Sequence, residues 1–291
     1  RKKIIVYGSL AYDRVMDFPG RFKDNFLPNK LHAINVSFAV PTLKEGYGGT
    51  AGNISYNLGL LKIRSTAVGS AGNDFTKYKN WLVWHNVDTR YIKVLKNYTT
   101  AGAYIITDSD DNQIAGFHYG AMSHAYGKFS QTLFKNSLVV IAPGNSEDMS
   151  NLVKICQRSR TPYIYDPGQQ ISSLTPLDLK NGVFKSGVFI GNDYEISLVA
   201  KKLHISEKSL IRQCHILIRT LGAKGSEIWE NNKCIKIKAA PAKKVVDPTG
   251  AGDAYRAGII YGLIHNWPWL QTGQLASQIA ARAVEKYGTQ N

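Results

Sequence analysis

Short apolar runs rich in β-branched residues alternate along this chain with stretches whose apolar residues recur at helical spacing. This alternation is typical of βαβ units, in which helices cover a mostly parallel sheet. The predicted strands are 4–8, 65–69, 138–142, 163–166, 187–190 and 216–220. The predicted helices are 52–61, 75–85, 146–158, 193–200 and 206–214. We therefore expect an α/β fold.

Two segments, at about 14–46 and 99–121, interrupt the alternation. In the second, residues 103–107 and 113–118 flank the polar turn 108–112, as the strands of a hairpin would. Extra strands inserted into an α/β core often cover its functional site. The sequence therefore predicts a single domain over 1–291, with a small β-sheet lid that closes on the substrate.

Composition excludes several classes of protein. No run of 18 or more apolar residues is present, so neither a transmembrane helix nor a membrane partner is expected. The three cysteines, Cys156, Cys214 and Cys234, have no CxxC spacing and fit a reducing, cytoplasmic location. The histidines form no HExxH motif, so any metal is expected to arrive with a nucleotide.

The net charge is strongly positive, with 36 Lys and Arg against 21 Asp and Glu, which gives +15. The basic residues are spread in pairs and triplets, and no recognisable nucleic-acid module accompanies them. A solvated basic surface that attracts an anion such as ATP is the favoured interpretation. Nucleic-acid binding is kept as an alternative, which predicts salt-sensitive retention of duplex DNA or RNA.

The segment from Val245 to Gly258, VVDPTGAGDAYRAG, carries the strongest chemical signal. A strand end passes through glycines into a predicted helix that runs to about Ile264. The free amides and the positive end of this helix suit a developing phosphoryl charge. Asp253 then stands where it can accept the proton of an attacking hydroxyl, while the amides of Gly250, Ala251 and Gly252 form an anion hole.

A purely structural interpretation of this segment exists, in which Asp253 caps its helix and the glycines make a tight turn. The P-loop pattern is absent, and Tyr255 occupies the third glycine position of GxGxxG, so neither of those nucleotide motifs applies. The complete string is more specific than either of its fragments.

DPTGAGDAYRAG resembles the C-terminal signature of the ribokinase-like carbohydrate kinases, and Gly48 to Asn53, GGTAGN, resembles their N-terminal GGxxxN signature. Asn192 to Glu195 and Thr220 to Gly225 are similar to the family's NxxE and TxGxxG motifs, in the right order. The resemblance implies a three-layer α/β/α core with a lid, and an ATP-dependent kinase. It also implies a homodimer joined through the lids.

The same resemblance implies the nucleotide and metal residues. Asn192 and Glu195 would organise Mg²⁺, its waters and the triphosphate, and Asp247 would shape a monovalent-cation site that suits K⁺. Thr220, Gly222 and Gly225 would lie along the ATP. Each has a structural alternative, since the NxxE residues can form a helix cap and the glycines a plain turn.

Substrate choice depends on the N-terminal half. In the family, an aspartate at the place of Asp13 accepts hydrogen bonds from two sugar hydroxyls, and an ionised carboxylate can take both. A further likeness, to the adenosine kinases of bacteria such as mycobacteria, extends over several short segments. They are 18–22, Leu27-Pro28, Leu31-His32, Ser37-Phe38, Asp166-Pro167 with Gln169-Gln170, and Asp247-Pro248-Thr249.

By this similarity the ribose and the adenine have separate sets of contacts. The ribose would be surrounded by Ser9, Asp13, Ser37, Gly49 and Asn53, and the adenine by Phe117, Gln169 and Gln170. A purine needs an aromatic or apolar face and amide groups for its nitrogens, whereas core packing of the lid is the alternative role of Phe117. The chain departs from the subfamily at Ala103, where an aromatic is usual, and at Ser173, where an arginine is usual.

The sequence thus predicts the reaction ATP + adenosine → ADP + AMP. The alternative within the same fold is a kinase of ribose, fructose or a similar sugar. A catalytically silent nucleotide- or sugar-binding regulatory protein is the alternative of another class, and intact Asp253, Gly250 and Gly252 argue against it.

Overall fold

The computed structural model describes residues 2–26 and 35–291, so Leu27-Pro28 and Leu31-His32 lie outside the described residues. A nine-stranded sheet forms the core, in the order β13-β12-β11-β10-β9-β8-β1-β4-β5. The strands from β11 to β5 run parallel, and β12 and β13 extend the sheet antiparallel at one edge. In chain order they are β1 Lys3–Tyr7, β4 Ser65–Gly72, β5 Val87–Leu95, β8 Ser137–Ile141, β9 Tyr163–Tyr165, β10 Val188–Asn192, β11 Ile216–Thr220, β12 Ser226–Glu230 and β13 Lys233–Ile237.

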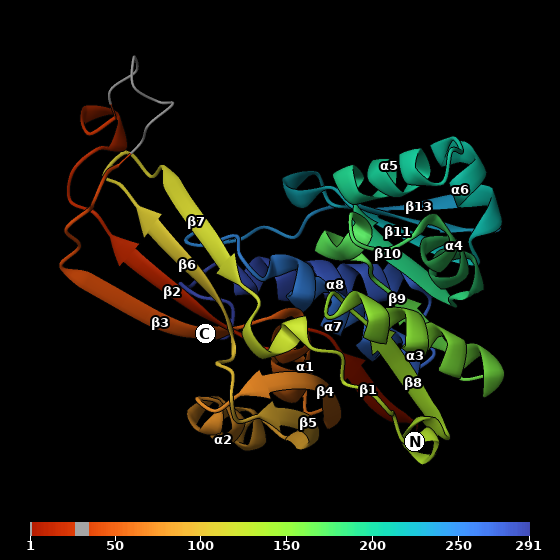
Figure 1. Cartoon of the computed structure of the whole chain (residues 1–291). Coiled ribbons are helices and arrows are strands. Elements are labelled where there is room, and N and C mark those ends of the chain that lie inside the picture. The colour runs from red at the N-terminus through yellow and green to blue at the C-terminus, as the bar shows by residue number, and fades with distance from the viewer. Residues whose placement is uncertain (1, 27–34) are drawn as a thin grey trace.

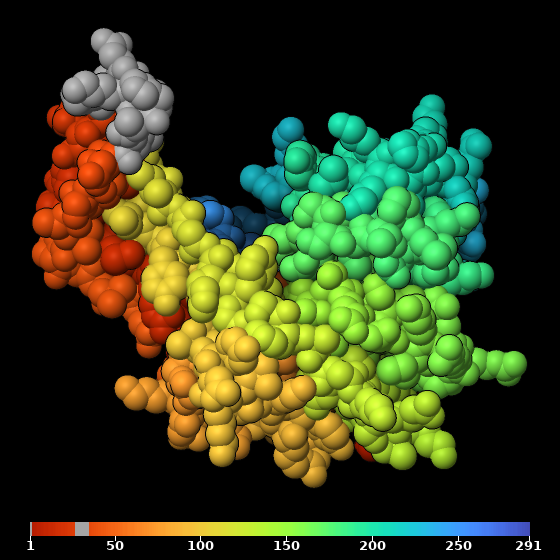
Figure 2. Space-filling model, viewed as in Figure 1, coloured from red at the N-terminus to blue at the C-terminus, as the bar shows by residue number. Residues whose placement is uncertain are grey.

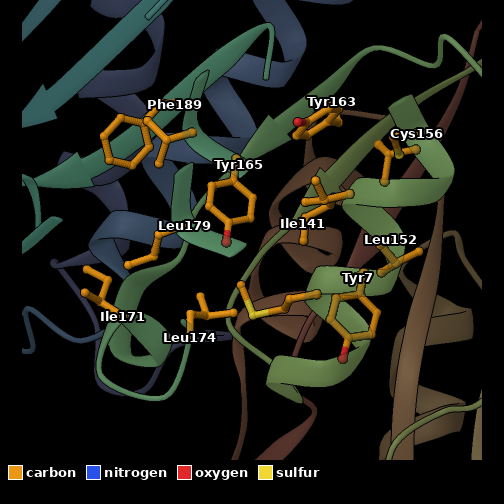
Figure 3. Packing of buried hydrophobic residues seen from close by; sticks show 14 of the residues in the cluster. Tyr7, Ile141, Leu152, Cys156, Tyr163, Tyr165, Ile171, Leu174, Leu179 and Phe189 are labelled. Atoms are coloured by element: carbon orange, nitrogen blue, oxygen red, sulfur yellow. The ribbon is translucent and has the colours of Figure 1, made fainter. Parts of the chain in front are cut away.

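Helices cover both faces of this sheet, because successive side chains of each buried strand point to opposite sides. On β1, Ile4 and Val6 join a cluster with helices α1 Thr50–Leu60, α7 Ala251–Ile264 and α8 Trp269–Ala283. Ile5 and Tyr7 join the cluster on the other face, part of which Figure 3 shows. The helices on that face are α3 Ser146–Arg158, α4 Pro176–Lys185, α5 Asp193–Lys202 and α6 Glu207–Gln213.

A second sheet of four strands, in the order β3-β2-β6-β7, stands apart from the core (Figure 1). Its strands are β2 Ala11–Asp17, β3 Thr42–Gly48, β6 Ala101–Thr107 and β7 Gln113–His118. The predicted hairpin is confirmed, because β6 and β7 pair antiparallel around a turn. Asp108 organises this turn by accepting hydrogen bonds from the backbone N–H groups of Asp110 and Asn112. The small sheet is the lid of the fold.

The six predicted core strands and the predicted helices are present, with shifts of one to three residues at several ends. The structure adds β5, β12, β13, α4 and α8 to the predicted elements. Helix α2 Thr76–Trp84 corresponds to the predicted helix 75–85 and is slightly shorter. Strands such as β5, with the sequence VDTRYIKVL, mix charged and apolar residues because they lie at a sheet edge. Their hydrophobic pattern is therefore weaker than that of a strand buried on both faces. Among the described helices, none combines the length and apolarity needed to cross a membrane.

Candidate active site

Several of the predicted site residues lie at the carboxyl ends of the parallel strands, the usual ligand edge of an open α/β sheet. Ser9 follows β1, Gln169 follows β9, and Asn192 and Thr220 end β10 and β11. The lid rises from the same edge, and Figure 2 shows an open hollow between the lid and the part of the core that carries α5. The site therefore has one wall from each sheet.

The N-terminus of α7 forms the centre of the site. Gly250 precedes the helix in the left-handed conformation, with φ of +80°, which glycine adopts without steric cost. Asp247 holds the turn, because its carboxylate accepts the N–H of Thr249 at 2.9 Å and of Gly288 at 3.0 Å. The Ala251 N–H contacts the Pro248 carbonyl at 3.3 Å, whereas no described residue accepts from the Gly252 and Asp253 amides. These two amides are free to bind an anion.

Asp253 lies in the first turn of α7 and is partly exposed. Its Oδ2 accepts a hydrogen bond of 2.8 Å from Nδ2 of Asn53, which belongs to α1. Burial raises the pKa of Asp253 to about 6, while Arg256 and the Asn53 hydrogen bond act in the lowering direction. A carboxylate with this pKa is ionised at neutral pH and still basic enough to accept a proton.

A buried ion pair lies one turn further along α7. Arg256, which is 8% exposed, donates from Nε to Oδ2 of Asp166, which is 2% exposed. The guanidinium also donates to the Gly252 carbonyl at 2.9 Å, so it supports the turn that carries Asp253. Neither residue was predicted from the sequence to have a role. A charged side chain three positions after Asp253, within an otherwise apolar helix, is the signal that could have identified Arg256.

Asp13 reaches the site from β2. Its Oδ2 would lie only 2.4 Å from a Cβ at Gly48, so the glycine leaves the space that this carboxylate fills. Gly49 has φ of +85°, and a Cβ there would meet the Ser9 carbonyl at 2.6 Å. Burial, and next the nearby Asp247, raise the pKa of Asp13 to about 6. The GG pair is therefore required by the shape of the site.

The register of the lid places Asp13, Ala103 and Phe117 in one row across β2, β6 and β7. Paired residues point to the same face of a sheet, so Phe117 shares the face of Asp13. Neighbouring strands are about 4.8 Å apart, and β6 lies between β2 and β7. The backbones at Asp13 and Phe117 are therefore roughly 10 Å from each other. Tyr104 lies on the opposite face, where its hydroxyl accepts from Arg14 at 3.1 Å, so it does not replace the aromatic that is absent at Ala103.

The remaining predicted substrate residues differ in their burial and in the elements that carry them. The Ser9 hydroxyl accepts the Thr50 N–H at 2.9 Å and thereby ties β1 to the start of α1. Ser37 is exposed in a segment without regular structure. Gln169 is exposed and Gln170 half-buried in the short 3₁₀ turn Gly168–Ile171 after β9. The structure brings Asp13, Asn53 and Asp253 together most directly.

The predicted nucleotide residues meet because β10 pairs with β11, which sets Asn192 opposite Thr220. Asn192 and Glu195 form a capping box at the start of α5, with two hydrogen bonds of 2.8 Å. Gly222 and Gly225 bracket a 3₁₀ turn after β11, with φ of +57° and +93°. A Cβ at Gly222 would meet open space, which leaves this turn accessible.

No cluster of three or more His, Cys, Asp or Glu side chains in the described part of the chain could enclose a metal ion. Asp166 Oδ1 is nevertheless buried without a hydrogen-bond partner. The pKa of Glu195 is raised by burial, and next by the proximity of Asp166. Two neighbouring carboxylates, one with an unsatisfied oxygen, fit the preference of Mg²⁺ for oxygen ligands.

A family model of pfkB carbohydrate kinases matches residues 1–291. The nucleoside kinase of Methanocaldococcus jannaschii is 29% identical, over 99% of this chain and 92% of that protein. The solved structure of Burkholderia thailandensis nucleoside kinase with inosine is 34% identical, with a TM-score of 0.87 over 99% of this chain and 92% of that chain. The same enzyme has been solved with ADP and inosine, at 35% identity and a TM-score of 0.85 over 99% of this chain and 90% of that chain.

Proposed function

Because this chain belongs to the pfkB family of carbohydrate kinases, we propose that it transfers the γ-phosphoryl group of ATP to the 5′-hydroxyl of a nucleoside. The observation that carries the proposal is the Asp253 carboxylate beside the unpaired amides of Gly252 and Asp253. The complexes of the similar Burkholderia enzyme support a nucleoside acceptor. Adenosine is the acceptor that the sequence resemblance favours, and its preference over inosine stays a prediction.

Asp253 acts as the general base. Oδ2 of Asp253 already accepts a hydrogen bond from Asn53, so Oδ1 is the oxygen that takes the proton from the acceptor hydroxyl. The hydroxyl oxygen forms a bond to the γ-phosphorus while the bond from that phosphorus to the β–γ bridging oxygen breaks, which leaves ADP. The Gly252 and Asp253 amides and the positive end of α7 stabilise the negative charge on the transferring group. The proton leaves Asp253 to solvent after the products depart.

Mg²⁺ bound with the triphosphate would neutralise phosphate charge, and Glu195 and Asp166 are the residues that would hold it. Thr220, Gly222 and Gly225 would border the ATP. Asp247 is the proposed monovalent-cation residue; its carboxylate already binds two backbone amides, so its main effect in the apo chain is to shape the turn before α7.

The acceptor would lie against the lid row. Asp13 would accept hydrogen bonds from the ribose hydroxyls, while the exposed ring of Phe117 would cover the base and Gln169 and Gln170 would meet its polar edge. The small Ala103 leaves room for the ligand between Asp13 and Phe117. Closure of the lid would exclude water and so limit ATP hydrolysis.

An ATP-coupled assay with adenosine, inosine, guanosine, ribose and fructose tests this function. Strong turnover of nucleosides is expected. Turnover of free sugars alone would establish the sugar kinase instead, and the absence of any ATP-dependent turnover would favour a silent binding protein.

Replacement of Asp13 by asparagine is expected to raise KM for the nucleoside by about 10- to 100-fold, with a smaller change in kcat. The reason is that an asparagine has one acceptor oxygen and loses the charge-assisted hydrogen bonds to two hydroxyls. Initial-rate kinetics measure both constants. Asp17→Asn, on the same strand but exposed and paired with Lys44, is the matched control. An unchanged KM in Asp13→Asn would exclude this carboxylate from acceptor binding.

We expect the chain to form a homodimer through its lid. All six residues of β7 are exposed, and Leu43 on the other edge strand is 62% exposed. Such uncovered edge strands are prone to pair with another chain. Light scattering is expected to give twice the mass of 32.2 kDa, and a monomeric mass would refute the expectation.

A further inference from the structure

Asn53 lies in a hydrogen-bond network that extends well beyond Asp253. Its Oδ1 accepts a hydrogen bond of 3.0 Å from Nε2 of Gln290 and lies 2.9 Å from the hydroxyl of Thr289. That hydroxyl is also 2.8 Å from the Tyr47 carbonyl, so its single proton is shared between two acceptors. With Oδ1 occupied in this way, Asn53 faces Asp253 with its Nδ2.

The direction of the network is set at its far end. The Trp81 indole nitrogen is only a donor, and it lies 3.0 Å from Oε1 of Gln290. Gln290 must therefore turn its oxygen toward Trp81 and its NH₂ toward Asn53. By the same reasoning Asn53 turns its oxygen toward Gln290 and its NH₂ toward the carboxylate. Each amide orientation follows from the previous one, which leaves no ambiguity between amide oxygen and nitrogen.

The surroundings hold this network tightly. Tyr78 is fully buried; its hydroxyl accepts from Gln290 Nε2 and donates to the Gly48 carbonyl at 2.7 Å. A Cβ at Gly52 would lie 1.8 Å from that hydroxyl, so only glycine at this position admits the Tyr78 contact. Asn53 itself is 4% exposed. Around an amide as buried as that of Asn53, a misoriented side chain would leave polar groups unpaired.

We propose that Gln290 and Trp81 are positioning residues that keep the Asn53 amide oriented as a hydrogen-bond donor to the catalytic base. This inference rests on the proposed role of Asp253. Figure 1 places the C-terminal end beside the base of the lid strands, and Thr289 contacts β3 through Tyr47. The segment 288–291 thus links the lid, α1 and the carboxylate of Asp253 in one hydrogen-bond network.

The charged groups that face Asp253 come from several elements. Arg256 on α7 lowers its pKa, whereas Asp166 after β9 and Asp13 on the lid raise it. The Asn53 hydrogen bond lowers the pKa, so losing its orientation raises the pH above which the base is ionised. A disoriented amide that turned its oxygen toward Asp253 would act in the same direction by repulsion.

Gln290→Leu removes this orientation without adding charge, and it is the variant that tests the proposal. The acidic limb of the profile of kcat/KM against pH is expected to move up by about one unit, because a hydrogen bond to a charged group is lost or weakened. At pH 5, kcat/KM is then expected to fall about tenfold relative to the wild type, and the two curves are expected to approach each other above about pH 8. Trp81→Phe removes the donor that holds Oε1 of Gln290, whereas Tyr78 still accepts from Nε2, so a smaller shift of the limb in the same direction is expected. Gln213→Leu, on the exposed face of α6, is the matched control and is expected to leave the limb in place.

A direct titration of Asp253 separates this proposal from the nucleoside kinase function. The carboxyl carbon of ¹³C-labelled aspartate can be followed by NMR without substrate, with Asp253 assigned from the signal that Asp253→Asn removes. A higher pKa of Asp253 in Gln290→Leu or Trp81→Phe supports the positioning role even if nucleosides prove not to be acceptors. An unchanged pKa in a folded variant overturns it, whatever the acceptor assay shows. If Gln290→Leu does not fold, Trp81→Phe decides by the same criterion.

Discussion

Asp253→Asn is expected to lower kcat by about 100-fold or more, because general-base catalysis contributes on the order of 10²- to 10⁴-fold. Asparagine has the size of aspartate and retains an oxygen that can accept from Asn53 Nδ2, so the geometry of the site is preserved. Only the ability to take the hydroxyl proton is lost. Steady-state kinetics with ATP and the best acceptor of the panel measure the effect, and near-normal turnover would assign the base elsewhere.

The pH dependence gives this prediction a second readout. The pKa of Asp253 rises from an ordinary 3.8 to about 6 in the folded chain. The folded protein therefore binds the proton of the Asp253 carboxyl more tightly than the unfolded chain does. As a result, the free energy of unfolding decreases as the pH rises from about 4 through 6. Asp253→Asn carries no such cost. The variant is expected to resist urea better than the wild type at pH 8, with an advantage that shrinks toward pH 4.

That stability result separates a catalytic defect from a folding defect. A variant that is inactive yet at least as stable at pH 8 has lost its base and kept its structure. The wild type is expected to gain activity as the pH rises through about 6, because Asp253 must be ionised to accept a proton. An activity profile that is flat across this range would contradict the assignment.

Arg256→Met is expected to lower the free energy of unfolding by about 3–5 kcal/mol, the usual consequence of removing one partner of a buried ion pair. The variant leaves Asp166, which is 2% exposed, without its counter-charge. Oδ1 of that carboxylate already has no hydrogen-bond partner, so both carboxylate oxygens would then be unpaired. The Gly252 carbonyl also loses its side-chain donor. Urea unfolding at pH 8 measures the change.

The companion variants make the result specific. Arg256→Met combined with Asp166→Leu is expected to recover much of the lost stability, because replacing both buried charges by apolar groups removes the unpaired one. Arg90→Met is the control, since its pair with Asp88 leaves the arginine side chain 77% exposed and such pairs contribute less than about 1 kcal/mol. A loss below about 1 kcal/mol in Arg256→Met would show that solvent reaches Asp166 readily.

Local sequence patterns predicted those helix ends, turns and strands whose conformation depends on residues close together in the chain. The start of α5 is one example, because Asn192 and Glu195 are three residues apart and form a capping box. The turn before α7 is another, since Gly250 supplies the left-handed conformation and Asp253 follows in the first helical turn. The same logic explains the strands buried on both faces of the core sheet, whose continuous apolar runs identified them.

The sequence by itself therefore determined the α/β class, the lid hairpin and the helix terminus that carries Asp253, because each depends on residues close together in the chain. Only the tertiary structure decided which distant groups meet at that terminus. Arg256 pairs with a carboxylate 90 positions away, and Gln290 donates to an amide oxygen 237 positions away. Such contacts depend on the order of strands in the sheet and on where the chain crosses between its two sheets. Neither the spacing of apolar residues nor a turn motif encodes that order, so these partners become visible only when the chain is folded.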